Sequence, residues 1–213
     1  MKHYLTYLLA AVFPLFASAY EGVFEYRIDS GDREWRMLCQ VKGPYVRAEV
    51  YLGTTHFQTI LQNDEGLLLL DELNKQIFQA DFEREKWGKP GEPERKRPTE
   101  GKFEFIEAFE RGGLAGDTFS IRSSRRDYWI EVAEGVGSMP GIFLDQFSSL
   151  RGLSEDGQFL FESHPGMPVR IYRKGRAKQP LLELVSHRAE AVDAATFEVG
   201  EGYIRAKMRF RMR

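Results

Sequence analysis

The chain is poor in residues that build catalytic or metal sites. It has one cysteine, Cys39, and no H-E-x-x-H, C-x-x-C or G-x-S-x-G sequence,. His56, His164 and His187 stand apart, and lone histidines are typical of surface or core positions rather than of metal sites,. Glycines fall at expected turns, not between a strand and a helix, which argues against a phosphate-binding loop. We therefore predict no catalytic residue, no metal and no cofactor.

Carboxylates are plentiful but do not mark a site. The chain has 32 acidic residues, so neighbouring pairs such as Glu155 and Asp156 are ordinary and assign no acid or base role,. We predict that the protein is not an enzyme, with a hydrolase as a distant alternative. The formal net charge of −2 gives no reason to expect a nucleic-acid partner,.

No apolar run is long enough to cross a membrane as a helix. The longest, an uncharged stretch of about sixteen residues before Tyr20, falls short of the roughly 20 required,. It follows a weakly basic start and ends in Ala17-Ser18-Ala19, an A-x-A processing site,. We predict a secretory signal peptide over residues 1–19, cleaved after Ala19, with an uncleaved anchor as the alternative. The protein is then periplasmic.

The single cysteine limits what the exported chain can contain. Removing residues 1–19 leaves about 194 residues with a net charge of −3 and no possible internal disulfide, so packing must supply the stability,. Cys39 lies far beyond the cleavage point and cannot carry the lipid of a lipoprotein. Its apolar alternation favours a buried small hydrophobe over a reactive thiol.

Alternating apolar and polar residues dominate the first part of the exported chain. Short turns separate segments that read as strands, and together they predict an antiparallel meander. The expected strands are 22–29, 34–42, 45–51, 56–62, 67–70 and 76–80. The hairpin at 64–80 contains four consecutive leucines, which favours a strand covered on both faces and a place in the middle of the sheet.

The second part mixes strands with one helix. Residues 81–101 carry many charges and three prolines, which predicts an exposed loop,. Residues 102–110 fit strand or helix, 135–141 read as a glycine-rich bend with Pro140, and 142–153 has the spacing of an amphipathic helix,. Further strands are expected at 117–122, 128–134, 158–163, 167–174 and 181–191. A turn at 193–196 can tuck Phe197 under the sheet.

These elements predict a mainly β (α+β) fold in one domain, residues 20–213. A sheet of this size tends to curl, so we expect a curved antiparallel sheet or a half-open β-barrel covered by one or two helices. Its concave apolar face is either core or a groove for an acyl chain. The candidate ligand-binding residues on that face are Trp35, Met37, Phe57, Leu67, Leu69, Phe78, Phe143 and Phe147.

The last residues form a basic alternating tail. It reads as an edge strand with one basic face or as a frayed end. Such a tail suits peripheral contact with anionic lipid headgroups or docking to a partner. Its basic residues are Arg205, Lys207, Arg209, Arg211 and Arg213. We expect the protein to be a monomer.

Four segments of the chain form a familiar series: F-E-Y-R-I after the leader, V-K-G-P-Y-V-R-A-E-V at 41–50, N-D-E-G-L-L-L-L-D-E-L-N-K-Q-I-F at 63–78 and A-A-T-F-E-V-G-E-G-Y-I at 194–204. Together they resemble an exported bacterial family, domain of unknown function 4412, which is similar in architecture to the LolA and LolB type of periplasmic lipoprotein carriers. The chain departs from the family in having Gly200 where a proline is usual and in lacking paired cysteines.

The resemblance implies a half-open β-barrel covered by helices, in the periplasm of a two-membrane bacterium. It implies binding of a lipid acyl chain or a lipidated protein, and it supplies no catalytic residues. The expected function is thus a non-enzymatic hydrophobic-ligand binding or carrier-like protein. The alternative is a structural or interaction module of the cell envelope with no small-molecule ligand.

Overall fold

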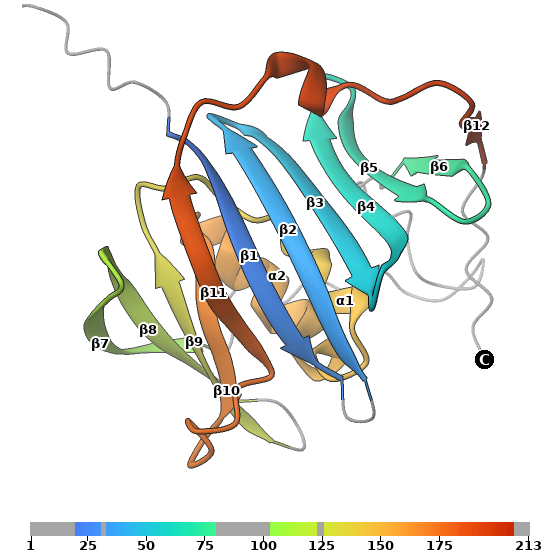
Figure 1. The fold of residues 1–213 in the computed structure, drawn as a ribbon. Helices are drawn as coiled ribbons and strands as arrows, with labels where there is room; N and C mark the ends of the chain where they lie inside the picture. Colours follow the sequence, from blue (N-terminus) through green and yellow to red (C-terminus); the bar gives the residue numbers. More distant parts are fainter. Residues whose placement is uncertain (1–19, 31–32, 80–102, 123–125, 207–213) are drawn as a thin grey trace, which may run out of the picture.

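The computed structural model describes residues 20–30, 33–79, 103–122 and 126–206 (Figure 1). The expected signal peptide and the expected loop at 81–101 lie outside these ranges. The strands are β1 (Glu21–Asp29), β2 (Glu34–Lys42), β3 (Tyr45–Leu52), β4 (Thr55–Asn63), β5 (Gly66–Asp71), β6 (Gln76–Gln79), β7 (Phe103–Arg111), β8 (Leu114–Arg122), β9 (Asp127–Ala133), β10 (Met167–Arg173), β11 (Leu182–Ala189) and β12 (Ile204–Arg205). The helices are α1 (Phe143–Gln146) and α2 (Ser154–Ser163), with 3₁₀ turns η1 (Arg151–Leu153) and η2 (Ala194–Phe197).

All the strands join one open sheet of 12 strands. Their hydrogen-bonded order is β12-β6-β5-β4-β3-β2-β1-β11-β10-β9-β8-β7, so β12 and β7 form its two ends. Every pairing is antiparallel except that of β12 with β6. The predicted β-rich, antiparallel architecture is confirmed at this level.

The hairpin of β5 and β6 lies near one end of the sheet, so the prediction that it occupies the middle was wrong. After β10, the chain returns as β11 beside β1, so the centre of the sheet is formed by β2 and β1. The four leucines were read correctly as a strand buried on two faces. Leu69 packs into the main core, whereas Leu68 and Leu70 pack into a second cluster on the opposite face.

The second face of β5 is covered by the C-terminal segment, residues 190–205, rather than by further strands. This segment crosses the sheet from β11 to β12 (Figure 1) and buries Val192 and Phe197 against the second cluster. Lys42 Nζ donates to Val192 O at 2.8 Å, and Asn63 Nδ2 donates to Phe197 O at 2.9 Å. The predicted turn that tucks Phe197 against the sheet is therefore confirmed.

The helical region differs from the prediction. The expected helix over 142–153 is broken into α1 and η1, and the longest helix, α2, includes Gln158–Ser163, which was predicted to be a strand. That part of α2 reads Q-F-L-F-E-S, a short apolar run from which periodicity alone cannot separate a buried strand from a buried helix. Of residues 102–110, for which strand and helix were both left open, 103–110 fall in the strand β7.

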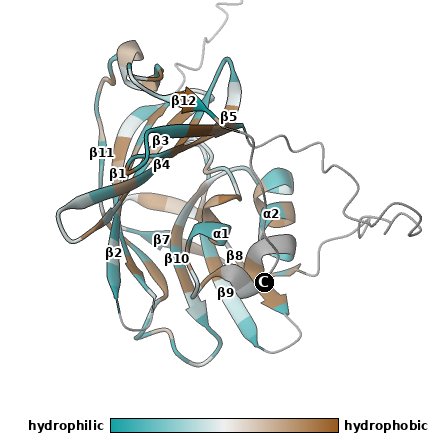
Figure 2. Cartoon of the chain, turned by 90° about the vertical axis from the view of Figure 1, so that its right-hand side faces the viewer, coloured by the Kyte–Doolittle hydropathy of each residue, from teal (hydrophilic) through white to brown (hydrophobic). Residues whose placement is uncertain are grey.

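The helices pack against the inner face of the sheet. Figure 2 shows α1 and α2 between the β3–β5 part and the β8–β10 part of the sheet. Their apolar side chains join one continuous core with residues of the central strands. The buried helical-region members are Ile142, Phe143, Leu144, Phe147, Leu150, Leu153, Leu160 and Phe161. For most of this face, the interpretation as core is correct. Among the described residues, no helix is both long and apolar enough to cross a bilayer.

Candidate functional site

The eight candidate residues of the inner face come together in the fold. Met37, Leu69, Phe143 and Phe147 are buried in the main core. Trp35, Leu67 and Phe78 are partly buried and pack against the same core. Phe57 is 40% exposed. Four of the eight are thus already enclosed by protein, and whether the others bind a ligand stays a prediction.

The partly exposed members line one end of the inner face, formed by β2 and β4–β6. The Trp35 ring lies between two phenylalanines, with centroid separations of 5.5 Å to Phe57 and 6.1 Å to Phe147. Both contacts are edge to face, the geometry that aromatic quadrupoles prefer,. Apolar surface therefore continues from the closed core to the solvent through Trp35.

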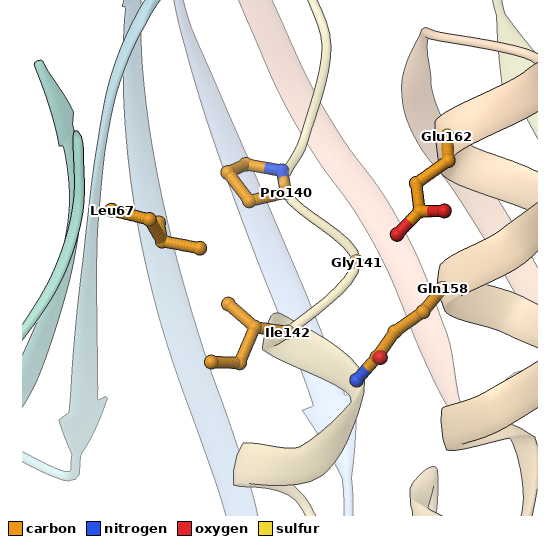
Figure 3. A pocket seen from close by; sticks show the side chains of 6 residues that line it. All are labelled: Leu67, Pro140, Gly141, Ile142, Gln158 and Glu162. Carbon is orange, nitrogen blue, oxygen red and sulfur yellow. The ribbon is translucent and has the colours of Figure 1, made fainter. Parts of the chain in front are cut away.

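A small hollow adjoins this end of the face. It has a volume of about 150 Å³ and is lined by Leu67, Pro140, Gly141, Ile142, Gln158 and Glu162. Figure 3 shows Leu67 reaching from β5 toward Pro140 and Ile142, while Gln158 and Glu162 approach from α2. One wall is thus a strand, and the others are the turn before α1 and the flank of α2.

Gly141 holds the turn close to α2. A Cβ atom at this position would lie 2.7 Å from the Cα of Gln158, a separation that side chains do not tolerate. Because glycine has no side chain, the turn can approach the helix and bring Ile142 over the hollow. The sequence signal was present in the glycine-rich bend, but nothing in one sequence tells which helix the bend will touch.

The polar wall offers hydrogen-bond acceptors. Gln158 Nε2 donates to Asp145 Oδ2 at 2.8 Å, so the amide is oriented by a side chain of α1. The Glu162 side chain belongs to an exposed residue at the rim. An apolar hollow with a wet, polar edge is an arrangement that accepts the end of an alkyl chain and leaves the rest in contact with the surface.

Of the eight candidate residues, only Leu67 lines the hollow. Sequence reasoning missed Gln158 and Glu162 because their segment was assigned to a strand, in which they would not have faced this turn. It also missed Pro140 and Gly141, which were read only as a bend. Ile142 was recognised as an apolar residue of the helix expected at 142–153, and its side chain was assigned to the core.

The histidines do not converge. His164 Nδ1 lies 3.1 Å from Ser163 Oγ, and its ring contacts Phe119 at 4.6 Å between centroids. His187 stacks on Phe24. His56 lies near Glu72 at the far side of the β5–β6 turn. Across the described residues, no group of three or more His, Cys, Asp or Glu side chains could hold a metal ion.

Cys39 is fully buried in the core. Burial raises the pKa of its thiol well above the usual value of 9.0. Since the thiolate is the reactive form, this environment suits the predicted role as a small hydrophobe.

The strongest polar cluster lies at the β5–β6 turn, away from the hollow. The Glu72 side chain is 6% exposed and accepts hydrogen bonds from Thr59 Oγ1 at 2.7 Å, from Lys75 Nζ at 3.0 Å and from the hydroxyl of Tyr203. Tyr203 belongs to the C-terminal segment, so Glu72 ties that segment to the turn. Sequence reasoning used Glu72 only as a turn residue.

Two solved structures align with most of this chain. An uncharacterized conserved protein from Thermus thermophilus aligns at 8% identity over 89% of this chain and 91% of its own, with a TM-score of 0.49. PNGF-II aligns at 12% identity over 89% of this chain and 31% of its own, with a TM-score of 0.52. This chain therefore spans about a third of the length of PNGF-II. At such identities the likeness concerns the fold alone. No protein-family model and no curated protein matches the chain.

Proposed function

We propose that the protein binds an acyl chain, of a lipid or of a lipidated protein, at the β4–β6 end of its inner face. The binding involves no covalent chemistry, and the role is that of a carrier-like protein in the periplasm after removal of residues 1–19. The observation that carries the proposal is the apolar hollow beside Leu67, on the same inner face of the sheet as the partly buried ring of Trp35.

The architecture supports this reading. An open antiparallel sheet with helices against one face agrees with the half-open barrel implied by the resemblance to the LolA and LolB type of carriers. In such an arrangement, a ligand chain enters between the helices and the sheet. Here the free space lies at the end where α1 and the preceding turn meet β5.

The size of the hollow determines how a ligand would sit. A volume of about 150 Å³ is below the roughly 300–1,000 Å³ typical of pockets that enclose a whole small molecule,. The terminal part of an acyl chain fits inside, and the remainder lies along Trp35, Phe57 and Phe78. Longer insertion requires movement of α1, which has only four residues and no side-chain cap at its start,.

Replacing Leu67 with tryptophan should weaken acyl binding at least tenfold. The indole fills the hollow, and excluding two methylene groups from a buried site costs about 1.6 kcal/mol, more than the 1.4 kcal/mol of a tenfold change. Binding is measured by titration with a fluorescent fatty acid. The matched control is Leu73→Trp, at an exposed leucine of the β5–β6 turn, which should bind like the unmodified protein.

If the Leu67→Trp and unmodified proteins bound the fatty acid equally well, the acyl chain would not bind in the hollow. Native mass spectrometry of protein recovered from a bacterial periplasm provides an independent test, with a co-purified lipid as the expected result. If no lipid co-purified and no fatty acid bound, the proposal would be contradicted.

A structural or interaction role in the envelope is the second candidate. One feature favours it: β7 is exposed on both faces and forms an end of the sheet. The proposed membrane contact of the basic tail belongs to this candidate. Within the described part of the tail, Arg205 already pairs with Glu65.

A further inference from the structure

The free edge of β7 has the properties of a site for strand addition. β7 is nine residues long and is hydrogen-bonded to β8 on one side, and no strand of the described residues pairs with its other side. Phe105 and Ile106 on this strand are 59% and 37% exposed, although large apolar side chains are costly in water,. An edge of this length presents a row of backbone donors and acceptors to a further strand.

The turn after β7 determines which backbone groups face outward. Gly112 and Gly113 both have positive φ, of 59° and 79°, as a two-residue hairpin turn requires,. Such a turn makes Arg111 and Leu114 a hydrogen-bonded pair. Since bonded and non-bonded pairs alternate, Ala108, paired with Asp117, directs its N–H and C=O away from β8,. These groups are available to another strand.

The first part of β7 has one acidic and one apolar face. Because Ile106 is an extra residue in the strand, the register with β8 puts Glu104 and Glu107 on one face and Phe103, Phe105 and Ala108 on the other. Beyond Ala108 this separation ends, since Glu110 shares the face of the phenylalanines and Arg111 the face of the glutamates. The last residues of the chain have a pattern that complements this first part. Residues 207–213 read K-M-R-F-R-M-R, with cations at every second position and Met or Phe between them. Opposite charges and apolar side chains facing each other across strands stabilise a pairing.

We propose that the free edge of β7 binds residues 207–213 of a second copy of this chain as an added strand. Main-chain hydrogen bonds provide the affinity, and the acidic and aromatic side chains of β7 select the basic, apolar tail. The charges and the bulge at Ile106 also protect the edge against indiscriminate pairing,.

The opposite placement of tail and edge requires the second copy. Ala206 N donates to Ile77 O at 2.8 Å, which fixes the start of the tail on β6, next to the end of the sheet opposite β7 (Figure 1). Seven extended residues span about 23 Å. β12 and β7 are the opposite ends of the open sheet and do not pair with each other, so we assign the edge that the tail meets to a second copy.

The test combines a truncated protein with a peptide. The unmodified protein should self-associate with increasing concentration in analytical ultracentrifugation, and a variant ending at Ala206 should stay monomeric. A fluorescent peptide with the sequence of residues 206–213 should bind the truncated protein in an anisotropy titration. A peptide of the same composition in which the basic residues are consecutive should bind at least tenfold more weakly.

Two substitutions locate the site. Ala108→Pro removes one outward N–H while leaving the hydrogen bonds to β8 intact, and it should weaken peptide binding at least tenfold. Glu104→Lys should also weaken peptide binding at least tenfold, because it places a cation opposite the basic peptide. This variant tests the site even if the proline variant does not fold. Both variants are checked by circular dichroism.

If both the Glu104→Lys and the Ala108→Pro variants bound the peptide as tightly as the truncated protein without these changes, the proposal would be overturned. Failure of the peptide to bind the truncated protein would overturn it as well. Monomeric behaviour of the unmodified protein at every concentration would also overturn it, because the tail would then not reach a second copy. Binding of the peptide only to vesicles containing anionic phospholipid would assign the tail to membranes instead.

Discussion

Replacing Phe143 with alanine is expected to lower the free energy of unfolding by about 3–5 kcal/mol. The Phe143 side chain is fully buried, and its ring lies 5.5 Å from the ring of Phe161 on α2. Removing it takes apolar area out of the core and leaves a cavity between the helical region and the sheet. Chemical denaturation of the variant and the unmodified protein measures the difference.

The control uses a phenylalanine in a different environment. Phe105→Ala, at a side chain that is mostly exposed, should change the unfolding free energy by less than about 1 kcal/mol,. If Phe143→Ala lowered the unfolding free energy as little as Phe105→Ala, the helical region would not be part of the core. The inner face would then be far more open than the packing indicates.

Replacing Glu72 with alanine should cost about 1.5–3 kcal/mol, the range for hydrogen bonds to a charged group. The change removes the acceptor of Thr59, Lys75 and Tyr203 together. The C-terminal segment should loosen, so amides of residues 200–206 should exchange hydrogen faster. Glu190→Ala, which breaks an exposed pair with Arg188, should change stability by less than about 0.5 kcal/mol,.

The same carboxylate gives stability a pH dependence. Burial raises the pKa of Glu72, but hydrogen bonds from Tyr203, Thr59 and Lys75 outweigh it and lower the pKa below 4.5. A lowered folded-state pKa means that the stabilisation is present above pH 4.5 and is lost as the pH falls through the folded-state value,. Glu72→Gln should show a smaller loss of stability between about pH 5 and 3. An unchanged pH profile would contradict this assignment.

Much of the sheet could be predicted because its signals are local. The alternation around Trp35, Met37 and Cys39 identified β2, and the turn at Gly43 marked its end. The prediction failed where distant segments decide the outcome. Four leucines in β5 showed burial on two faces, but only the path of residues 190–205 explains what covers the second face.

The candidate site was predicted in part for the same reason. The two-residue repeat of a β-strand predicted that Leu67 faces the inner side of the sheet, and this residue does line the hollow. Gln158 and Glu162 reach it because α2 is a helix, which an apolar run as short as F-L-F does not establish,. The contact of Gly141 with α2 depends on tertiary packing, which no local pattern encodes.

Quenching of Trp35 fluorescence by a brominated fatty acid tests the proposed acyl site most directly. Trp87→Phe and Trp129→Phe leave Trp35 as the only tryptophan, at 5.5 Å from Phe57 beside the proposed path of the ligand. A protein that keeps only Trp129, which packs against Tyr172, is the control. We predict saturable quenching of Trp35 and little change in Trp129. Unquenched Trp35 at saturating fatty acid would contradict the account.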